Sequence, residues 1–128
     1  MLGLELLPIL FSILIVGGGA GAPPRAFVAL LNNLVVDTLN FLRSKYDYVF
    51  TTGGIGPTHD DITAQSVSKA FGIKYEIHKE AFKILEAYYK PGEFNDGRQK
   101  MVKMPENAEL ILNPTSGAPG FSVENVYC

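Results

Sequence analysis

The sequence predicts an α/β fold, a single three-layer domain over residues 1–128 with helices on both faces of a mostly parallel sheet. Three observations predict it. Short β-branched and aromatic runs alternate with helical stripes along the chain. The length of 128 residues suits one domain with one core. A content of 47% hydrophobic and 19% charged residues is typical of a folded chain. The ligand site of such a sheet is expected beyond the carboxyl ends of its strands.

The first apolar run covers residues 2–16 and favours a buried strand over residues 9–16. A targeting segment is the alternative, but no Lys or Arg precedes the run, and it is shorter than the roughly 20 apolar residues of a membrane helix. The turn that follows formally matches a dinucleotide-binding fingerprint through Gly17, Gly19 and Ala22. Two prolines interrupt the helix start that this fingerprint needs, so a structural turn is favoured and dinucleotide binding is a third alternative.

The next segment predicts an amphipathic helix that begins near Pro24, a residue suited to a first turn, and runs to Ser44. The side chains that recur at helical spacing are Phe27, Leu30, Leu31, Leu34, Thr38, Phe41 and Leu42. Two asparagines and the pair Val35 and Val36 weaken the middle, and a break there is the alternative.

The central stretch, residues 46–63, reads as a strand, a glycine turn and the start of a helix. The strand is short, β-branched and aromatic, and is expected to end near Thr52. The turn contains Gly53, Gly54, Gly56 and Pro57, which stop regular structure. A helical pattern then runs through Phe71 and closes at Gly72, where a left-handed residue is expected.

This stretch has the chemistry of an anion site. Glycines let backbone N–H groups approach an anion, and a helix start adds unpaired donors, so a phosphate is the natural ligand. Asp60 and Asp61 would repel a bare phosphate, but a divalent cation such as Mg²⁺ would bridge them to it. The alternative is a capped turn, because either aspartate suits an N-cap and Thr58 with Asp61 fits a loose capping box.

The remainder of the chain continues the alternation. We expect a strand at residues 73–77, a helix at 81–89, a polar flexible segment at 94–99, a strand at 109–112, a tight loop at 113–120 and a strand at 121–127. Arg98 is either a phosphate ligand or a solvated surface charge, and the second is favoured. His78 lies at a helix start and is expected at the surface.

Composition excludes several classes of function. The net charge of −2 without a Lys/Arg cluster argues against nucleic-acid binding through a basic face. The single cysteine, Cys128, cannot form an intrachain disulfide or a zinc site and fits a reducing cytoplasm. We therefore expect a cytoplasmic protein with no nucleic-acid partner and no membrane partner.

The run Thr-Thr-Gly-Gly-Ile-Gly-Pro-Thr-His-Asp-Asp-Ile-Thr, from Thr51 to Thr63, resembles the signature of the MoaB/Mog (molybdopterin-binding) domain family, and most of all its CinA-like branch. Residues 98–108 and 113–121 support the resemblance, which covers residues 46–128. It implies a Rossmann-like domain connected with molybdenum cofactor biosynthesis. It also implies a pterin or adenine nucleotide ligand, Mg²⁺ or another divalent cation, and a homo-oligomer.

The resemblance also assigns roles. Asp61 matches the family's functional aspartate and would position the metal or substrate, with Asp60 in support. Residues expected to bind substrate are Thr52, Gly53, Gly54, Gly56, Thr58 and Thr63 in the central stretch, and Ser116, Gly117 and Gly120 in a loop that closes the pocket. The implied reaction transfers or hydrolyses a phosphoanhydride, as a nucleotide pyrophosphatase or a molybdopterin adenylyltransferase does.

Two departures from the family pattern favour an alternative of a different class. Residues 17–22 stand where the family carries an acidic turn, with too few residues after them for an additional strand and helix, and the family's C-terminal helix has no counterpart. The domain therefore looks shortened at both ends. The alternative is a non-catalytic, truncated or vestigial binding domain, which would expose apolar surface and self-associate.

Overall fold

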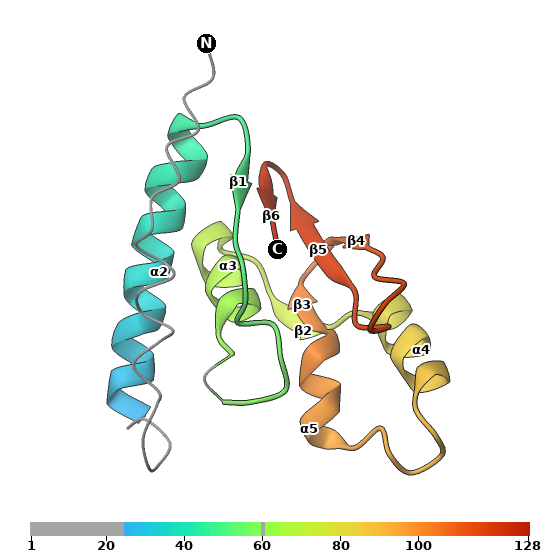
Figure 1. Ribbon diagram of the computed structural model, residues 1–128. Helices are drawn as coiled ribbons and strands as arrows, with labels where there is room; N and C mark the ends of the chain where they lie inside the picture. The colour runs from blue at the N-terminus through green and yellow to red at the C-terminus, as the bar shows by residue number, and fades with distance from the viewer. Residues whose placement is uncertain (1–24, 60) are drawn as a thin grey trace.

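The computed structural model describes residues 25–59 and 61–128 (Figure 1). The strand expected at residues 9–16 and the glycine turn at 17–22 lie outside the described residues. The first described element is helix α2 (Arg25–Lys45), which is continuous over 21 residues. The alternative of a break in its middle is wrong, because Val35 and Leu39 are buried there, and this packing outweighs the weak helix propensity of valine and asparagine.

In order, the other elements are β1 (Val49–Phe50), α3 (Thr63–Phe71), β2 (Tyr75–Ile77), α4 (Lys79–Tyr88), α5 (Asp96–Gln99), the 3₁₀ helix η1 (Lys100–Val102), β3 (Lys103–Pro105), β4 (Glu109–Ile111), β5 (Gly120–Val123) and β6 (Val126–Tyr127). As far as α4 the elements alternate between helices and strands as predicted, whereas α5, η1 and then four successive strands follow. Helix α3 ends at Gly72, which is left-handed with φ 66°, as expected.

Three short elements depart from the prediction. The segment expected to be flexible contains α5, which begins where the Asn95 side chain accepts a hydrogen bond from the Arg98 N–H at 3.1 Å. Helix η1 and strand β3 follow without a break. Strand β3 pairs antiparallel with β2, where Tyr75 lies opposite Pro105.

The described strands form a four-stranded sheet in the order β1-β6-β5-β4 and a separate pair, β2 and β3. The α/β class is confirmed. The expected mostly parallel pairing is wrong for these strands, because only β1 and β6 are parallel. The single strand expected at residues 121–127 is a hairpin that turns at Glu124 and Asn125, with Glu124 at φ 49°. A two-residue connection joins only antiparallel strands.

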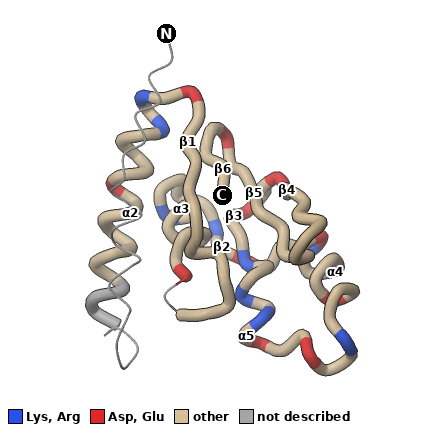
Figure 2. The backbone as a smooth tube through the Cα atoms, in the orientation of Figure 1, with Lys and Arg blue, Asp and Glu red and all other residues tan. Residues whose placement is uncertain are grey.

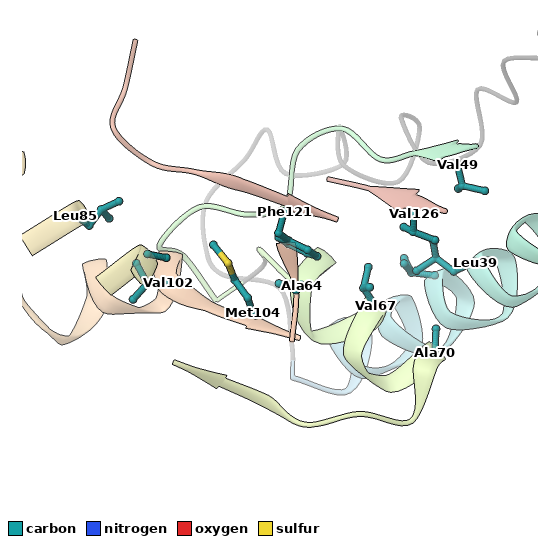
Figure 3. Close-up of a cluster of buried hydrophobic side chains, with 13 residues drawn as sticks. Leu39, Val49, Ala64, Val67, Ala70, Leu85, Val102, Met104, Phe121 and Val126 are labelled. Atoms are coloured by element: carbon teal, nitrogen blue, oxygen red, sulfur yellow. The ribbon is translucent and has the colours of Figure 1, made fainter. Parts of the chain in front are cut away.

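One part of the core lies between the sheet and the helices α2 and α3, and it continues to Leu85 of α4 and to Val102 and Met104. Figure 3 shows Val126 and Phe121 pointing from the sheet toward Leu39 of α2 and Val67 of α3, and all four are at most 1% exposed. The opposite side of β1 is different, since Phe50 is 70% exposed. Within the described residues, helices therefore cover only one face of β1. The prediction of helices on both faces of the sheet is not met at this strand.

Candidate functional site

The glycine turn between β1 and α3 is held in shape by Thr63. Gly53 and Gly54 adopt φ angles of 75° and 70°, which glycine reaches without the strain of a side chain. The Thr63 N–H donates to the Gly54 carbonyl and the Thr63 hydroxyl donates to the Gly53 carbonyl, both at 2.9 Å. A Cβ at Gly54 would collide with that hydroxyl. Thr63 therefore fastens the turn to the first residue of α3.

Asp61 is fixed beside this turn by Thr58. The Thr58 N–H donates to Asp61 Oδ2 at 2.9 Å, and the Thr58 hydroxyl donates to the same oxygen. A Cβ on Gly56 would lie 2.6 Å from Oδ2, so only glycine lets the carboxylate come this close. Residue Ile62 precedes α3 without a side-chain cap. The Asp61 carboxylate thus binds the turn and does not cap the helix. Its proposed partner Asp60 lies outside the described residues.

The turn and Asp61 form one wall of a small cavity. Its lining residues are Gly54, Ile55, Gly56, Asp61 and Ala64 from the turn and α3; Tyr75, Lys100, Met101, Lys103 and Met104 from β2, η1 and β3; and Pro119 and Phe121 from the loop before β5 and from β5 itself. Its volume is about 10 Å³, room for one water-sized group.

Two lysines, Lys100 and Lys103, line this cavity. Neither of them is among the site residues predicted from the sequence. Lys100 Nζ donates to the Thr58 carbonyl, so it reaches the residue that holds Asp61. Lys103, three residues further along, lines the same cavity from β3. Lys and Arg recur along the segment from α5 to β3 (Figure 2). Both lysines lie in the block at residues 98–108 that carries the family resemblance, and that block was the available signal.

The loop at residues 113–120 contributes less to the cavity than expected. Ser116, Gly117 and Gly120 do not line it, whereas the neighbouring Pro119 does. The Ser116 hydroxyl accepts a hydrogen bond from the Asn113 side chain at 2.8 Å.

The two glycines of this loop serve local packing. Gly117, at φ 72°, lies against the Tyr88 ring, where an added Cβ would be 2.6 Å from the nearest ring carbon. Gly120 faces the Cys128 carbonyl so closely that a Cβ would collide with it. Their role in ligand binding stays a prediction, and so does that of the exposed Thr52.

Arg98 and His78 have structural partners. The Arg98 guanidinium lies 4.5 Å from the centre of the Tyr89 ring and donates to the Glu93 carbonyl at 2.6 Å. His78 is half-buried and not at the surface as expected. Its Nδ1 accepts from the Ala81 N–H at 3.3 Å, which caps α4.

A second, larger cavity of about 350 Å³ lies between α4 and the segment before α5. It is lined by Phe82, Glu86, Tyr89, Lys90, Pro91, Gly92, Phe94 and Gln99. The rings of Phe82, Tyr89 and Phe94 pack on one another, with Phe94 centred 5.0 Å from Phe82 and 6.0 Å from Tyr89. None of the predicted site residues lines it.

The residues of the first cavity provide too few metal ligands by themselves, so they suit a metal ion only if a bound phosphate supplies further oxygen atoms. Among the described residues, no group of three or more His, Cys, Asp or Glu side chains is placed to hold a metal ion. Asp61 offers its second carboxylate oxygen, Oδ1, since Oδ2 already accepts from Thr58. Mg²⁺ in proteins is commonly held by one or two carboxylates together with phosphate oxygens, so this donor set fits Mg²⁺ on a phosphate ligand.

Comparison with known proteins decides the family. Residues 31–128 match the sequence profile of a family described as "Probable molybdopterin binding domain". The chain belongs to this family. The resemblance noted from the central stretch is thereby confirmed.

Relatives of the chain within the molybdopterin-binding domain family include larger proteins. A protein of Archaeoglobus fulgidus is 36% identical over 94 residues, which are 73% of this chain and 40% of the relative. A "CinA-like protein" of Geotalea uraniireducens is 39% identical over 89 residues, 68% of this chain and 21% of that one. A "Putative competence-damage inducible protein" of Alkaliphilus oremlandii is 40% identical over 80 residues, which are 61% of this chain and 19% of that protein. The chain thus spans two fifths or less of these relatives.

A solved structure shows the same fold. The protein CinA of Thermoplasma acidophilum, whose function is described as unknown, superposes with a TM-score of 0.68 at 28% sequence identity. The match covers 75% of this chain and 59% of that chain. The domain therefore has the CinA-like fold. The described part of the chain has no helix with the length and apolar character needed to cross a bilayer.

Proposed function

We propose that this molybdopterin-binding domain binds a pterin or adenine nucleotide that carries a pyrophosphate, with Mg²⁺, and transfers or hydrolyses its phosphoanhydride. One observation carries the proposal: the glycine turn presents its backbone beside a carboxylate that Thr58 holds in place. The N–H groups of Gly53, Gly54 and Gly56 would hold a phosphate, as at other glycine turns before a helix.

The residues of the chain would act by positioning and by charge. Asp61 Oδ1 would hold the cation, and Thr63 would keep the turn in its binding shape. Mg²⁺ would neutralise charge on the phosphates, which is most of what phosphoryl-type chemistry requires of a catalyst. The cavity of about 10 Å³ suits a metal-bound water or a phosphate oxygen, so the ring of the ligand would lie outside it.

The test is isothermal titration of the chain with ADP-ribose and with ATP, each with and without Mg²⁺, alongside Asp61→Asn. The amide still accepts from Thr58, so the variant should fold, but it loses the charge that attracts the cation. We expect Mg²⁺-dependent binding that is lost in the variant, together with loss of turnover. Equal binding and turnover by Asp61→Asn would contradict the role of Asp61.

Binding without catalysis is the second candidate function. It is supported by the loop at residues 113–120, because Ser116, Gly117 and Gly120 do not line the described cavity. Ligand binding with no product formed, measured on the same samples, would favour this candidate. Dinucleotide binding at residues 17–22 would instead give NAD binding that is unaffected by Asp61→Asn.

We also propose that the protein is a cytoplasmic homo-oligomer. Exposed apolar side chains support self-association: Leu30, Leu34 and Phe41 on α2, and Tyr48 and Phe50 around β1, are 46–70% exposed. Their contact with a second copy would bury them. Light scattering coupled to size-exclusion chromatography should therefore give a mass of at least twice 14.0 kDa. A monomer at high concentration would contradict this.

A further inference from the structure

Two lysines line the first cavity, and Lys103 is the one whose ammonium is available to bind a ligand, judged by its contacts with the described residues. It lines the cavity together with Gly54, Gly56 and Asp61, although it belongs to β3 and lies more than 40 positions away in sequence. Its side chain makes no hydrogen bond or ion pair with any described residue. Lys100, on the same wall, differs because its ammonium contacts the Thr58 carbonyl.

The backbone fixes the position of Lys103 even though its side chain is exposed. Lys103 pairs with Ile77 across the β2–β3 ladder, and the His78 N–H donates to the carbonyl of the preceding Val102 at 2.8 Å. Val102 is fully buried, and so is Met104 on the other side of Lys103. An exposed lysine between two buried residues is thus held on the cavity wall by the packing of its neighbours.

We infer that Lys103 is a specificity residue of the site, whose ammonium binds the second phosphate of a diphosphate ligand. This inference rests on the proposed function. The glycine turn and Asp61 with its cation would hold one phosphate, and only a ligand with a neighbouring phosphate would place a second anion near Lys103. An ammonium acts as a point charge toward phosphate and needs no fixed geometry.

Tyr75, in strand β2, also supports the binding of a second phosphate. It lines the cavity, and burial raises the pKa of its phenol, so the hydroxyl keeps its proton and can donate to an anion. Lys103 and Tyr75 thus bring two donors from the β2–β3 pair to a cavity that Asp61 lines from the turn before α3, and these donors suit phosphate oxygens that the cation does not hold. A ligand with one phosphate would leave these donors unused.

The experiment titrates ADP and AMP, which differ by one phosphate, into the wild-type chain and into Lys103→Met at constant Mg²⁺. Methionine keeps much of the length of the side chain and removes its charge. The control variant is Lys83→Met, which makes the same change on the exposed surface of α4 and lines neither cavity. Circular dichroism melting verifies that each variant is folded.

We expect Lys103→Met to weaken ADP binding about tenfold, the lower end for a charge-assisted hydrogen bond, and AMP binding less than threefold. Lys103→Arg should restore most of the ADP affinity, and Lys83→Met should change neither ligand. An equal loss for ADP and AMP, or no loss, would overturn the inference while the proposed function stands. A wild-type chain that binds neither nucleotide would overturn the inference together with the adenine nucleotide as the ligand of the proposed function.

Discussion

At the scale of single residues, the site depends on two glycines that lie against side chains of the turn. Gly54 is left-handed and touches the Thr63 hydroxyl, and Gly56 touches the Asp61 carboxylate. The positive φ angle and the lack of space for a Cβ each favour glycine at residue 54 for a separate reason. Their effects on stability can be separated because Gly72 is also left-handed but has open space around it.

Gly54→Ala should therefore destabilise the domain more than Gly72→Ala. Both variants place alanine at a positive φ, which costs about 1–2 kcal/mol. Only Gly54→Ala adds a collision, and overpacking costs about 1–3 kcal/mol more. Urea unfolding measures both free energies. Equal losses in the two variants would show that the Thr63 contact does not constrain the turn.

Cys128 gives a second prediction at this scale. Burial raises the pKa of its thiol to about 11, well above the pKa of an exposed cysteine, so almost none of it is thiolate at pH 8. Since the thiolate is the reactive form, Ellman's reagent should label the folded chain much more slowly than the urea-unfolded chain. Labelling at the same rate in both states would show that Cys128 is exposed in solution.

At the scale of elements, the start of α4 depends on one side chain, that of His78. His78 accepts from the Ala81 N–H, and its Nε2 lies 3.2 Å from the Ala108 carbonyl before β4. The residue thus caps the helix and connects it to the sheet. A sequence pattern shows only a histidine at a helix start, since its partner at Ala108 is 30 residues away.

His78→Ala should cost about 0.5–2 kcal/mol of unfolding free energy, the usual loss of an N-cap. His78→Asn keeps an acceptor for the Ala81 N–H and should recover part of that loss. Thermal unfolding of the two variants provides the comparison. If alanine and asparagine behave alike, the cap contributes nothing and only the contact with Ala108 matters.

The elements that could be predicted from sequence are those that show a hydrophobic period or are bounded by glycine or proline. Helix α3 and the turn before it carry both, and Gly72 marks the end of α3. The elements α5, η1 and β3 have three or four residues each, too few to show a period, so the lysines that they bring to the cavity could not be placed. The hairpin of β5 and β6 was missed because its turn contains no glycine.

At the scale of the whole molecule, long-range contacts decide what local pattern cannot. The glycine turn follows β1 directly in the chain, so it lies beyond the carboxyl end of that strand, where the ligand site is predicted. Which loops face this turn depends on the packing of β3 and β5 against α3. Of the loop at residues 113–120, only Pro119 reaches the cavity, and sequence alone could not distinguish it from its neighbours.

The proposed ligand binds at the glycine turn and not in the larger aromatic cavity beside α4. Two-dimensional ¹H–¹⁵N NMR of the labelled chain, titrated with ADP and Mg²⁺, tests it most directly. We predict that the amide signals of Gly53, Gly54 and Gly56 shift most, with Lys103 among the next. Shifts concentrated at Phe82, Tyr89 and Phe94, with the glycine signals unmoved, would place the ligand in the aromatic cavity instead.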